Sequence, residues 1–457
     1  MNLKEKINKY IFTSSNKIKI NSKEVIKNDI FLALRGSKNH GNKFINEALK
    51  AGAKYCITDK YFYKLKDKDN ILLVDDIFLF LKKLSIKKRL LIEGEIIGIT
   101  GSAGKTSLKE NLNFLLKKNY KVSASIKSYN NKLGVMISIL NTNIYSDYAI
   151  FEIGTNNFGE IKDLTKLVKP SQVFITNILS THLESFKNKI NIAKEKSDIF
   201  NKKYNDFVKT LYFQNNTKAE SIINNLAKKQ KLKKIIKVGK NDVDCYIKNK
   251  KYKNSNHEII LKIFNKSFKI LINDYEEHRV TNLIFILTFF IVNKINTDVV
   301  IKNANNIPFV EGRGSRHNVL LNKYKIKLID ESYNANPETM INSINNFSTI
   351  KDNNCSKILI LGNMNELGIK TLTLHCKVIK HIEIHSFERV ILCGDFFKKA
   401  LNMFSDLKNK YVYKNSTRSI MSYLMQNVHK KAIIMIKSSN DTEVNKLAKV
   451  LKLKKEG

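Results

Sequence analysis

The sequence predicts an α/β protein of three domains, and three observations support this fold class. The chain has 457 residues, whereas a single domain usually contains about 100–200. Short apolar runs alternate with helical patterns along most of the chain. In the middle of the chain, a glycine-rich turn at residues 101–104 connects an apolar run to a helical stripe.

The first predicted domain covers residues 1–92 and is small. β-like runs occur at residues 29–34, 55–58 and 71–74, and residues 42–51 have a helical pattern. We therefore expect a small N-terminal α/β domain.

The second predicted domain covers residues 93–309 and begins with a strand at 95–100, the glycine-rich turn and a helix. Further strands at 148–153 and 172–178 are apolar almost throughout. Continuous apolar strands are typical of a parallel sheet that is buried on both faces. The segment therefore predicts a doubly wound central domain.

The third predicted domain covers residues 310–457 and follows Ile307 and Pro308. Asn336 before Pro337 is a typical helix start, with Asn as the cap and Pro at the first helical position. The predicted strands are residues 326–329, 357–361, 389–393 and 432–436. Alternation of these strands with helices predicts a Rossmann-like α/β domain.

The formal net charge of +40 would permit a nucleic-acid partner. However, the lysines are spread over nearly every segment, and Trp is absent. No clustered basic and aromatic stretch is visible, so we expect a solvated basic surface and no nucleic-acid partner.

The cysteine pattern and the hydropathy indicate a cytoplasmic, soluble protein. The five cysteines are widely spaced and include no C-x-x-C pair, as expected of reduced thiols. No signal peptide opens the sequence, and the apolar run at 283–292 is too short to span a bilayer. We expect a monomer without stable membrane insertion.

The glycine-rich turn predicts a phosphate-binding loop, because backbone N–H groups at a helix start attract anions. Lys105 would contact the β and γ phosphates of ATP, and Thr106 would bind Mg²⁺. Ile99 stands where the general motif has its first glycine. The predicted nucleotide-binding residues are Gly101, Ser102, Ala103, Gly104, Lys105, Thr106 and Ser107.

Glu152 ends an apolar strand and should project from the carboxyl edge of the sheet toward this loop. A carboxylate in that place can hold Mg²⁺ directly or through water. Taken alone, a carboxylate at a strand end is more often a surface residue.

Several motifs that follow the loop resemble those of the Mur ligase family in their order and spacing. The shortened loop is also similar to the family's own form, and residues 21–23 and 31–36 resemble its uridine-binding domain. The central motifs are Asn130-Asn131 with Gly134, Glu152 to Asn156 with Gly159-Glu160, Thr176-Asn177 and His182-Leu183-Glu184.

The resemblance implies an ATP-dependent ligase that forms an amide through an acyl phosphate. Residues 330–337 and 361–368, with His375, resemble the branch that adds D-alanyl-D-alanine to UDP-N-acetylmuramoyl-tripeptide. Departures from the family pattern occur at residues 40–42, 276–279 and 437–440.

The resemblance also implies site residues beyond the loop. His182 and Lys196 match catalytic positions that bind a second Mg²⁺, with a carbamate on Lys196. The implied nucleotide contacts are Asn282, Arg313 and Asp330. The implied substrate contacts are Ser22, Arg35, Thr155, Asn156, Asn334 and Asn336.

Three other functions remain open on the sequence alone. One is a different Mur-family ligase, forming the tripeptide or resembling folylpolyglutamate synthase. The second is a basic P-loop ATPase that acts on nucleic acid. The third is a scaffold without turnover, which the intact Lys105, Thr106, Glu152, His182 and Lys196 argue against.

Overall fold

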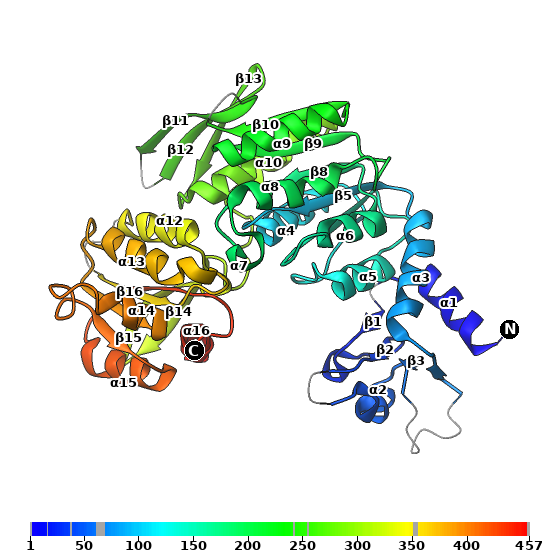
Figure 1. Cartoon of the computed structure of the whole chain (residues 1–457), viewed down its shortest axis with the longest axis horizontal. Coiled ribbons are helices and arrows are strands. Elements are labelled where there is room, and N and C mark those ends of the chain that lie inside the picture. The colour runs from blue at the N-terminus through cyan, green and yellow to red at the C-terminus, as the bar shows by residue number, and fades with distance from the viewer. Residues whose placement is uncertain are drawn as a thin grey trace.

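The computed structural model describes residues 2–15, 17–36, 39–60, 69–240, 243–253, 256–350 and 355–454. Within them, three β-sheets follow one another along the chain, each accompanied by helices (Figure 1). Most strand pairs are parallel, which confirms the predicted α/β fold class.

The first sheet is parallel throughout and has the order β1-β2-β3-β4. Its strands are β1 (Ile18–Lys19), β2 (Ile30–Ala33), β3 (Tyr55–Thr58) and β4 (Ile71–Leu73). Its helices are α1 (Leu3–Thr13), η1 (Ser22–Glu24), η2 (Gly41–Phe44), α2 (Ile45–Lys50) and α3 (Ile77–Leu91). Helices α1 and α3 both contact α5 (Lys132–Asn141) of the next sheet's helical layer.

The second sheet has nine strands in the order β13-β12-β11-β10-β9-β8-β5-β7-β6. The parallel strands are β5 (Glu95–Thr100), β6 (Val122–Ala124), β7 (Tyr148–Glu152), β8 (Gln172–Ile175), β9 (Thr210–Asn215) and β10 (Lys234–Gly239). Antiparallel pairing of β11 (Cys245–Lys253), β12 (Asn256–Ile263) and β13 (Lys266–Ile272) extends one edge.

Helices cover both faces of this sheet, as the apolar strands predict. Helices α4 (Lys105–Leu116), α10 (Glu277–Val292) and α11 (Asp298–Asn303) share a core on one face. The other face carries α5, α6 (Glu160–Val168), α7 (Leu183–Phe186), α8 (Lys189–Ser197), η4 (Asp198–Phe200) and α9 (Lys218–Lys229).

The third sheet has the order β14-β15-β19-β16-β17-β18, and only the β14–β15 pair is antiparallel. Its strands are β14 (Ser315–Leu321), β15 (Tyr324–Glu331), β16 (Ser356–Gly362), β17 (Arg389–Cys393), β18 (Val412–Lys414) and β19 (Ala432–Lys437). Its helices are α12 (Pro337–Ser348), η5 (Gly368–Lys370), α13 (Thr371–Ile382), α14 (Asp395–Leu401), α15 (Thr417–Asn427) and α16 (Glu443–Lys452).

Candidate functional site

The loop between β5 and α4 depends on two glycines for different physical reasons. Gly101 has φ 144°, and a Cβ atom there would lie 1.8 Å from the hydroxyl oxygen of Thr176. Gly104 has φ 80° with no atom within 4 Å of an added Cβ, so its left-handed backbone alone favours glycine. The loop therefore has the compact strand-to-helix geometry that the sequence predicts.

The side chain of Lys105 folds back over this loop. Its Nζ donates to the carbonyl oxygen of Gly101 at 2.9 Å. Burial lowers the pKa of Lys105, Glu152 opposes that shift, and Arg313 adds to it. The ammonium therefore lies among the groups that the sequence predicts to surround the phosphates.

Glu152 lies at the carboxyl end of β7, fully buried, and faces the start of α4 as predicted. The hydroxyl of Thr106 donates to Glu152 Oε2 at 2.7 Å, and Asn130 Nδ2 donates to Oε1 at 2.7 Å. Ser128 Oγ lies 3.2 Å from the Thr106 hydroxyl. A hydroxyl and a carboxylate side by side are oxygen ligands that Mg²⁺ prefers.

A buried lysine that the sequence analysis missed anchors the loop carrying Ser128 and Asn130. Lys109, one turn further along α4, has no exposed surface. Its Nζ donates to the carbonyl oxygens of Ser125, at 2.5 Å, and Lys127. It also lies 2.8 Å from Glu110 Oε1. Lys109 thus ties the loop after β6 to the phosphate-loop helix.

Lys196 on α8 is buried, with 2% of its surface exposed. Unlike the side chain of Lys109, the side chain of Lys196 makes no hydrogen bond or ion pair with any residue that the structure describes. Burial holds the pKa of Lys196 well below its usual value, and the charge of Lys105 lowers it further, against a smaller effect of Glu195. The shift is toward the neutral amine. Neighbouring Lys194, in contrast, is exposed.

His182 contacts the C-terminal domain. Its backbone is left-handed, with φ 50°. Its Nδ1 lies 2.5 Å from Glu366 Oε2 in the loop after β16. Nearby, Ser180 and Lys189 both contact Glu338 of α12, with Lys189 Nζ 2.6 Å from its Oε1. Sequence reasoning missed both glutamates, since neither differs in type from other surface glutamates.

Of the three residues predicted to contact the nucleotide from outside the loop, Asn282 comes from α10, whereas Arg313 and Asp330 come from neighbouring segments, since the N–H of Gly314 donates to the carbonyl oxygen of Asp330 at 2.9 Å. Arg313 stacks at 4.1 Å over the ring of Tyr333, and its NH2 donates to Ser128 Oγ at 3.4 Å. Asp330 accepts from Lys452 at 2.8 Å. Asn282 is buried on α10. Of the three residues, Arg313 is thus the one that reaches the loop between β5 and α4, through Ser128 beside Thr106.

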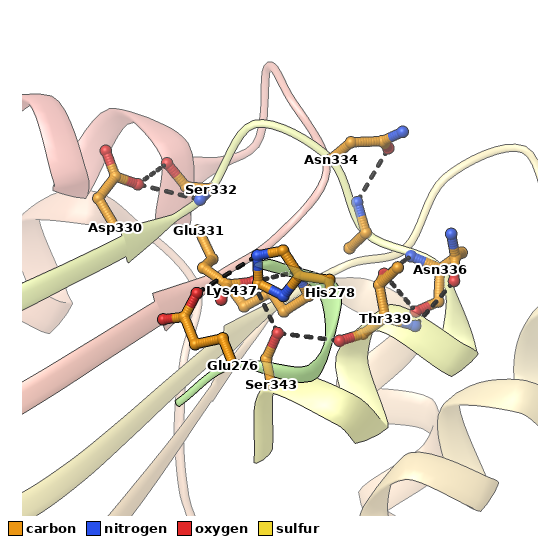
Figure 2. Close-up of polar contacts among 11 residues, drawn as sticks. Glu276, His278, Asp330, Glu331, Ser332, Asn334, Asn336, Thr339, Ser343 and Lys437 are labelled. Carbon is orange, nitrogen blue, oxygen red and sulfur yellow. Dashed lines mark hydrogen bonds and ion pairs between the residues drawn. The ribbon is translucent and has the colours of Figure 1, made fainter. Parts of the chain in front are cut away.

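The predicted substrate residues are distributed over all three sheets. Two are tied to local structure: Ser22 donates to Glu47 at 3.1 Å, and Asn336 caps α12 by accepting from the backbone N–H of Thr339 at 2.9 Å (Figure 2). Thr155 and Asn156 follow β7, whereas Arg35 and Asn334 are exposed. The structure does not bring these residues into one cluster.

A second polar cluster joins the start of α10 to the C-terminal sheet (Figure 2). Glu331 accepts from Lys437 at 2.7 Å and from Ser343 at 2.6 Å. Burial would raise the pKa of Glu331, but Lys437 and His278 outweigh it and hold the pKa below its usual value. Glu276 Oε2 lies 3.3 Å from His278. Glu276, His278 and Lys437 belong to the stretches 276–279 and 437–440, which depart from the pattern of the Mur ligase family.

The strand–loop–helix unit with its buried lysines and carboxylate defines a nucleotide-binding α/β protein of the phosphate-loop class. Sequence comparison identifies the family within this class. Residues 99–289 match the Mur ligase middle domain, and residues 315–440 match the Mur ligase, glutamate ligase domain. The UDP-N-acetylmuramoyl-tripeptide--D-alanyl-D-alanine ligase of Rickettsia prowazekii is 30% identical over 94% of each chain. The chain belongs to the Mur ligase family.

Solved structures share the whole fold. MurF from Acinetobacter baumannii gives a TM-score of 0.78 at 22% identity, covering 96% of this chain and 93% of that one. MurF ligase from Thermotoga maritima in complex with ADP gives a TM-score of 0.77 at 23% identity, and the match covers 97% of this chain and 98% of that one. A Mycobacterium tuberculosis folylpolyglutamate synthase gives a lower TM-score, 0.62, at 12% identity. That match covers 82% of this chain and 94% of the synthase chain. Among the described residues, no helix is long and apolar enough to cross a membrane.

Proposed function

We infer that this chain is an ATP-dependent ligase that adds D-alanyl-D-alanine to UDP-N-acetylmuramoyl-tripeptide. The observation that carries this inference is the 30% identity to a ligase of that name over 94% of both chains. The contacts among Lys105, Thr106 and Glu152 support ATP use, because they place a cation, a hydroxyl and a carboxylate at a phosphate-binding helix start.

The reaction couples two substitutions. A carboxylate oxygen of the tripeptide attacks the γ-phosphorus of ATP, and ADP leaves. The amine of D-alanyl-D-alanine then attacks the acyl carbon, phosphate leaves, and the amine loses a proton to complete the amide. The first step brings two anions together, the carboxylate and the triphosphate, so catalysis depends on positioning and charge neutralisation. Lys105 supplies positive charge beside the phosphates, and the charge of Arg313, from the third domain, acts on the same place.

The side chains at the loop fit Mg²⁺, since Thr106 and Glu152 offer adjacent oxygen ligands. We propose two ions, the first held by Thr106 and Glu152 and the second by His182 and a carbamate on Lys196. When bound, the ions would neutralise phosphate charge.

The environment of Lys196 supports the carbamate. A neutral amine is the form of lysine that captures CO₂, and burial beside Lys105 favours that form. An unmodified, protonated lysine would instead repel a nearby cation. Capture places the new C–N bond on Nζ, releases one proton and creates an anionic oxygen ligand.

We propose domain boundaries at residues 92/93 and 309/310, with uridine binding in the first domain, ATP binding in the second and D-alanyl-D-alanine binding in the third. Closure of the third domain about Ile307-Pro308 would complete the site. All five cysteines are free thiols, which supports a cytoplasmic enzyme. We further propose a monomer without a nucleic-acid partner.

Phosphate release tests the proposal. The purified chain should release phosphate from ATP only with both UDP-N-acetylmuramoyl-tripeptide and D-alanyl-D-alanine, in equal amount to the pentapeptide product. Turnover with UDP-N-acetylmuramoyl-dipeptide and an amino acid, or with folate and glutamate, would assign a different ligase. Phosphate release stimulated only by nucleic acid would reject the ligase assignment.

A further inference from the structure

Helix α3 presents an outward face that is apolar and basic. Its eight exposed residues occur in pairs at helical spacing, and none is acidic. Three of them are the lysines Lys82, Lys83 and Lys87. The other five are Phe78, Leu79, Ile86, Leu90 and Leu91, which are 46%, 50%, 43%, 64% and 45% exposed.

The buried face of α3 contains two basic residues that fix this orientation. Lys88 has no exposed surface and donates to the carbonyl oxygens of Ile11, Ser14 and Leu140 at 2.6–2.8 Å. Arg89 donates to the carbonyl oxygens at the end of α6. Burying two cations while exposing five large apolar side chains is opposite to the usual distribution. The bonds of Lys88 and Arg89 therefore hold the apolar side outward.

The apolar surface continues beyond the helix at one end. Phe207, from the segment after η4, is 46% exposed, and Arg89 lies 5.9 Å from the centre of its ring. Lys169 lies 5.5 Å from the same ring. Two parts of the chain that are far apart in sequence thus contribute to one apolar and basic surface.

We propose that the outward face of α3 adsorbs to the surface of an anionic lipid bilayer. A helix lying in the plane of a membrane buries apolar side chains at the headgroup boundary while its lysines contact anionic headgroups. The net charge of +40 attracts the whole chain to such a surface. This is peripheral binding, which requires no helix that spans the membrane.

Charge complementarity favours a membrane over a second copy of this chain as the occupant. A two-fold dimer through α3 would bring Lys82, Lys83 and Lys87 of both copies together, whereas an anionic surface neutralises them. Helix α3 also lies on the opposite side of the molecule from the third sheet (Figure 1). An adsorbed α3 would therefore leave the C-terminal domain free to close.

Vesicle co-sedimentation of the full chain at physiological salt tests the proposal. The chain should bind phosphatidylglycerol-containing vesicles and not vesicles of phosphatidylcholine alone. The double variant Ile86→Gln and Leu90→Gln should bind about tenfold more weakly, because less apolar area enters the interface. The matched control is Ile384→Gln with Met403→Gln, which removes two apolar residues of 69% and 63% exposure elsewhere. The control should bind like the wild type.

The charge requirement has its own pair of variants. Replacing Lys82 and Lys83 with Gln should weaken binding more than replacing Lys398 and Lys399, which are exposed on α14. All variants should keep full ligase activity and the wild-type melting temperature. Equal binding by the Ile86/Leu90 variant and its control would overturn the proposal, since net charge alone would then explain adsorption. A wild-type dimer in sedimentation velocity that the Ile86/Leu90 variant loses would assign the face to a second copy.

Discussion

Replacing Lys109 with methionine tests whether this buried lysine positions Thr106 and Glu152, the side chains proposed to bind Mg²⁺. Methionine keeps much of the side-chain length but cannot donate to the carbonyl oxygens of Ser125 and Lys127. An unsatisfied buried acceptor costs about 1–3 kcal/mol. The Ser125 acceptor is buried, whereas water can reach the exposed Lys127. We therefore expect the free energy of unfolding to fall by about 2–3 kcal/mol.

The functional effect should exceed what lost stability alone explains. Without Lys109, the loop carrying Ser128 and Asn130 is released from α4, and both residues contact the Thr106–Glu152 pair. We expect the Mg²⁺ concentration for half-maximal phosphate release to rise about tenfold, equivalent to about 1.4 kcal/mol. Titrating Mg²⁺ at saturating ATP measures this shift, and urea denaturation measures stability.

Lys88→Met provides the matched control. Lys88 is equally buried and also donates to carbonyl oxygens, but it joins α1, α3 and α5 away from the phosphate loop. Its loss should lower stability and leave the Mg²⁺ requirement unchanged. If both variants shifted the Mg²⁺ requirement equally, or if Lys109→Met shifted neither quantity, the positioning role would be refuted.

Three further predictions concern the loop and Lys196. Lys105→Ala should abolish phosphate release while circular dichroism stays unchanged, because the cation beside the phosphates is lost; normal turnover would remove the loop assignment. Lys196→Ala should abolish turnover, and wild-type enzyme depleted of CO₂ should lose activity and regain it when bicarbonate is added. Normal activity of Lys196→Ala together with an inactive Lys194→Ala would show that the carbamate had been assigned to the wrong lysine. Gly101→Ala should abolish ATP binding in calorimetry, whereas Gly104→Ala should cost about 1–2 kcal/mol in urea denaturation; equal effects would contradict the steric argument.

Sequence reasoning predicted the strand–turn–helix geometry of the loop after β5 because its signals are local. The glycines, Lys105 and Thr106 lie within a few residues of one another, and Glu152 is identified by the apolar strand before it. The roles of Ser128 and Lys109 depend on contacts between separate elements. One lysine among many carries no sequence signal that it will be buried.

Helix α3 shows a different limit of sequence patterns. Helical periodicity identifies two faces but does not say which one is buried. The usual rule would place Ile86 and Leu90 in the core and Lys88 in water, whereas the structure does the reverse. The deciding contacts join Lys88 to Ile11 and Leu140, which are 77 and 52 residues away.

Three of the buried lysines, Lys88, Lys109 and Lys196, differ in a way that bears on chemistry. Burial lowers the pKa of Lys88 to about 7, and its three N–H groups are matched by three carbonyl acceptors. Lys109 likewise donates to two carbonyl oxygens and lies beside a carboxylate. Lys196 has no such partner in the described chain, and its strongest charged neighbour is another lysine. Of the three, Lys196 therefore combines a lowered pKa with an Nζ that no described residue engages, which is an argument for the proposed carbamylation that rests on the structure and not on family resemblance.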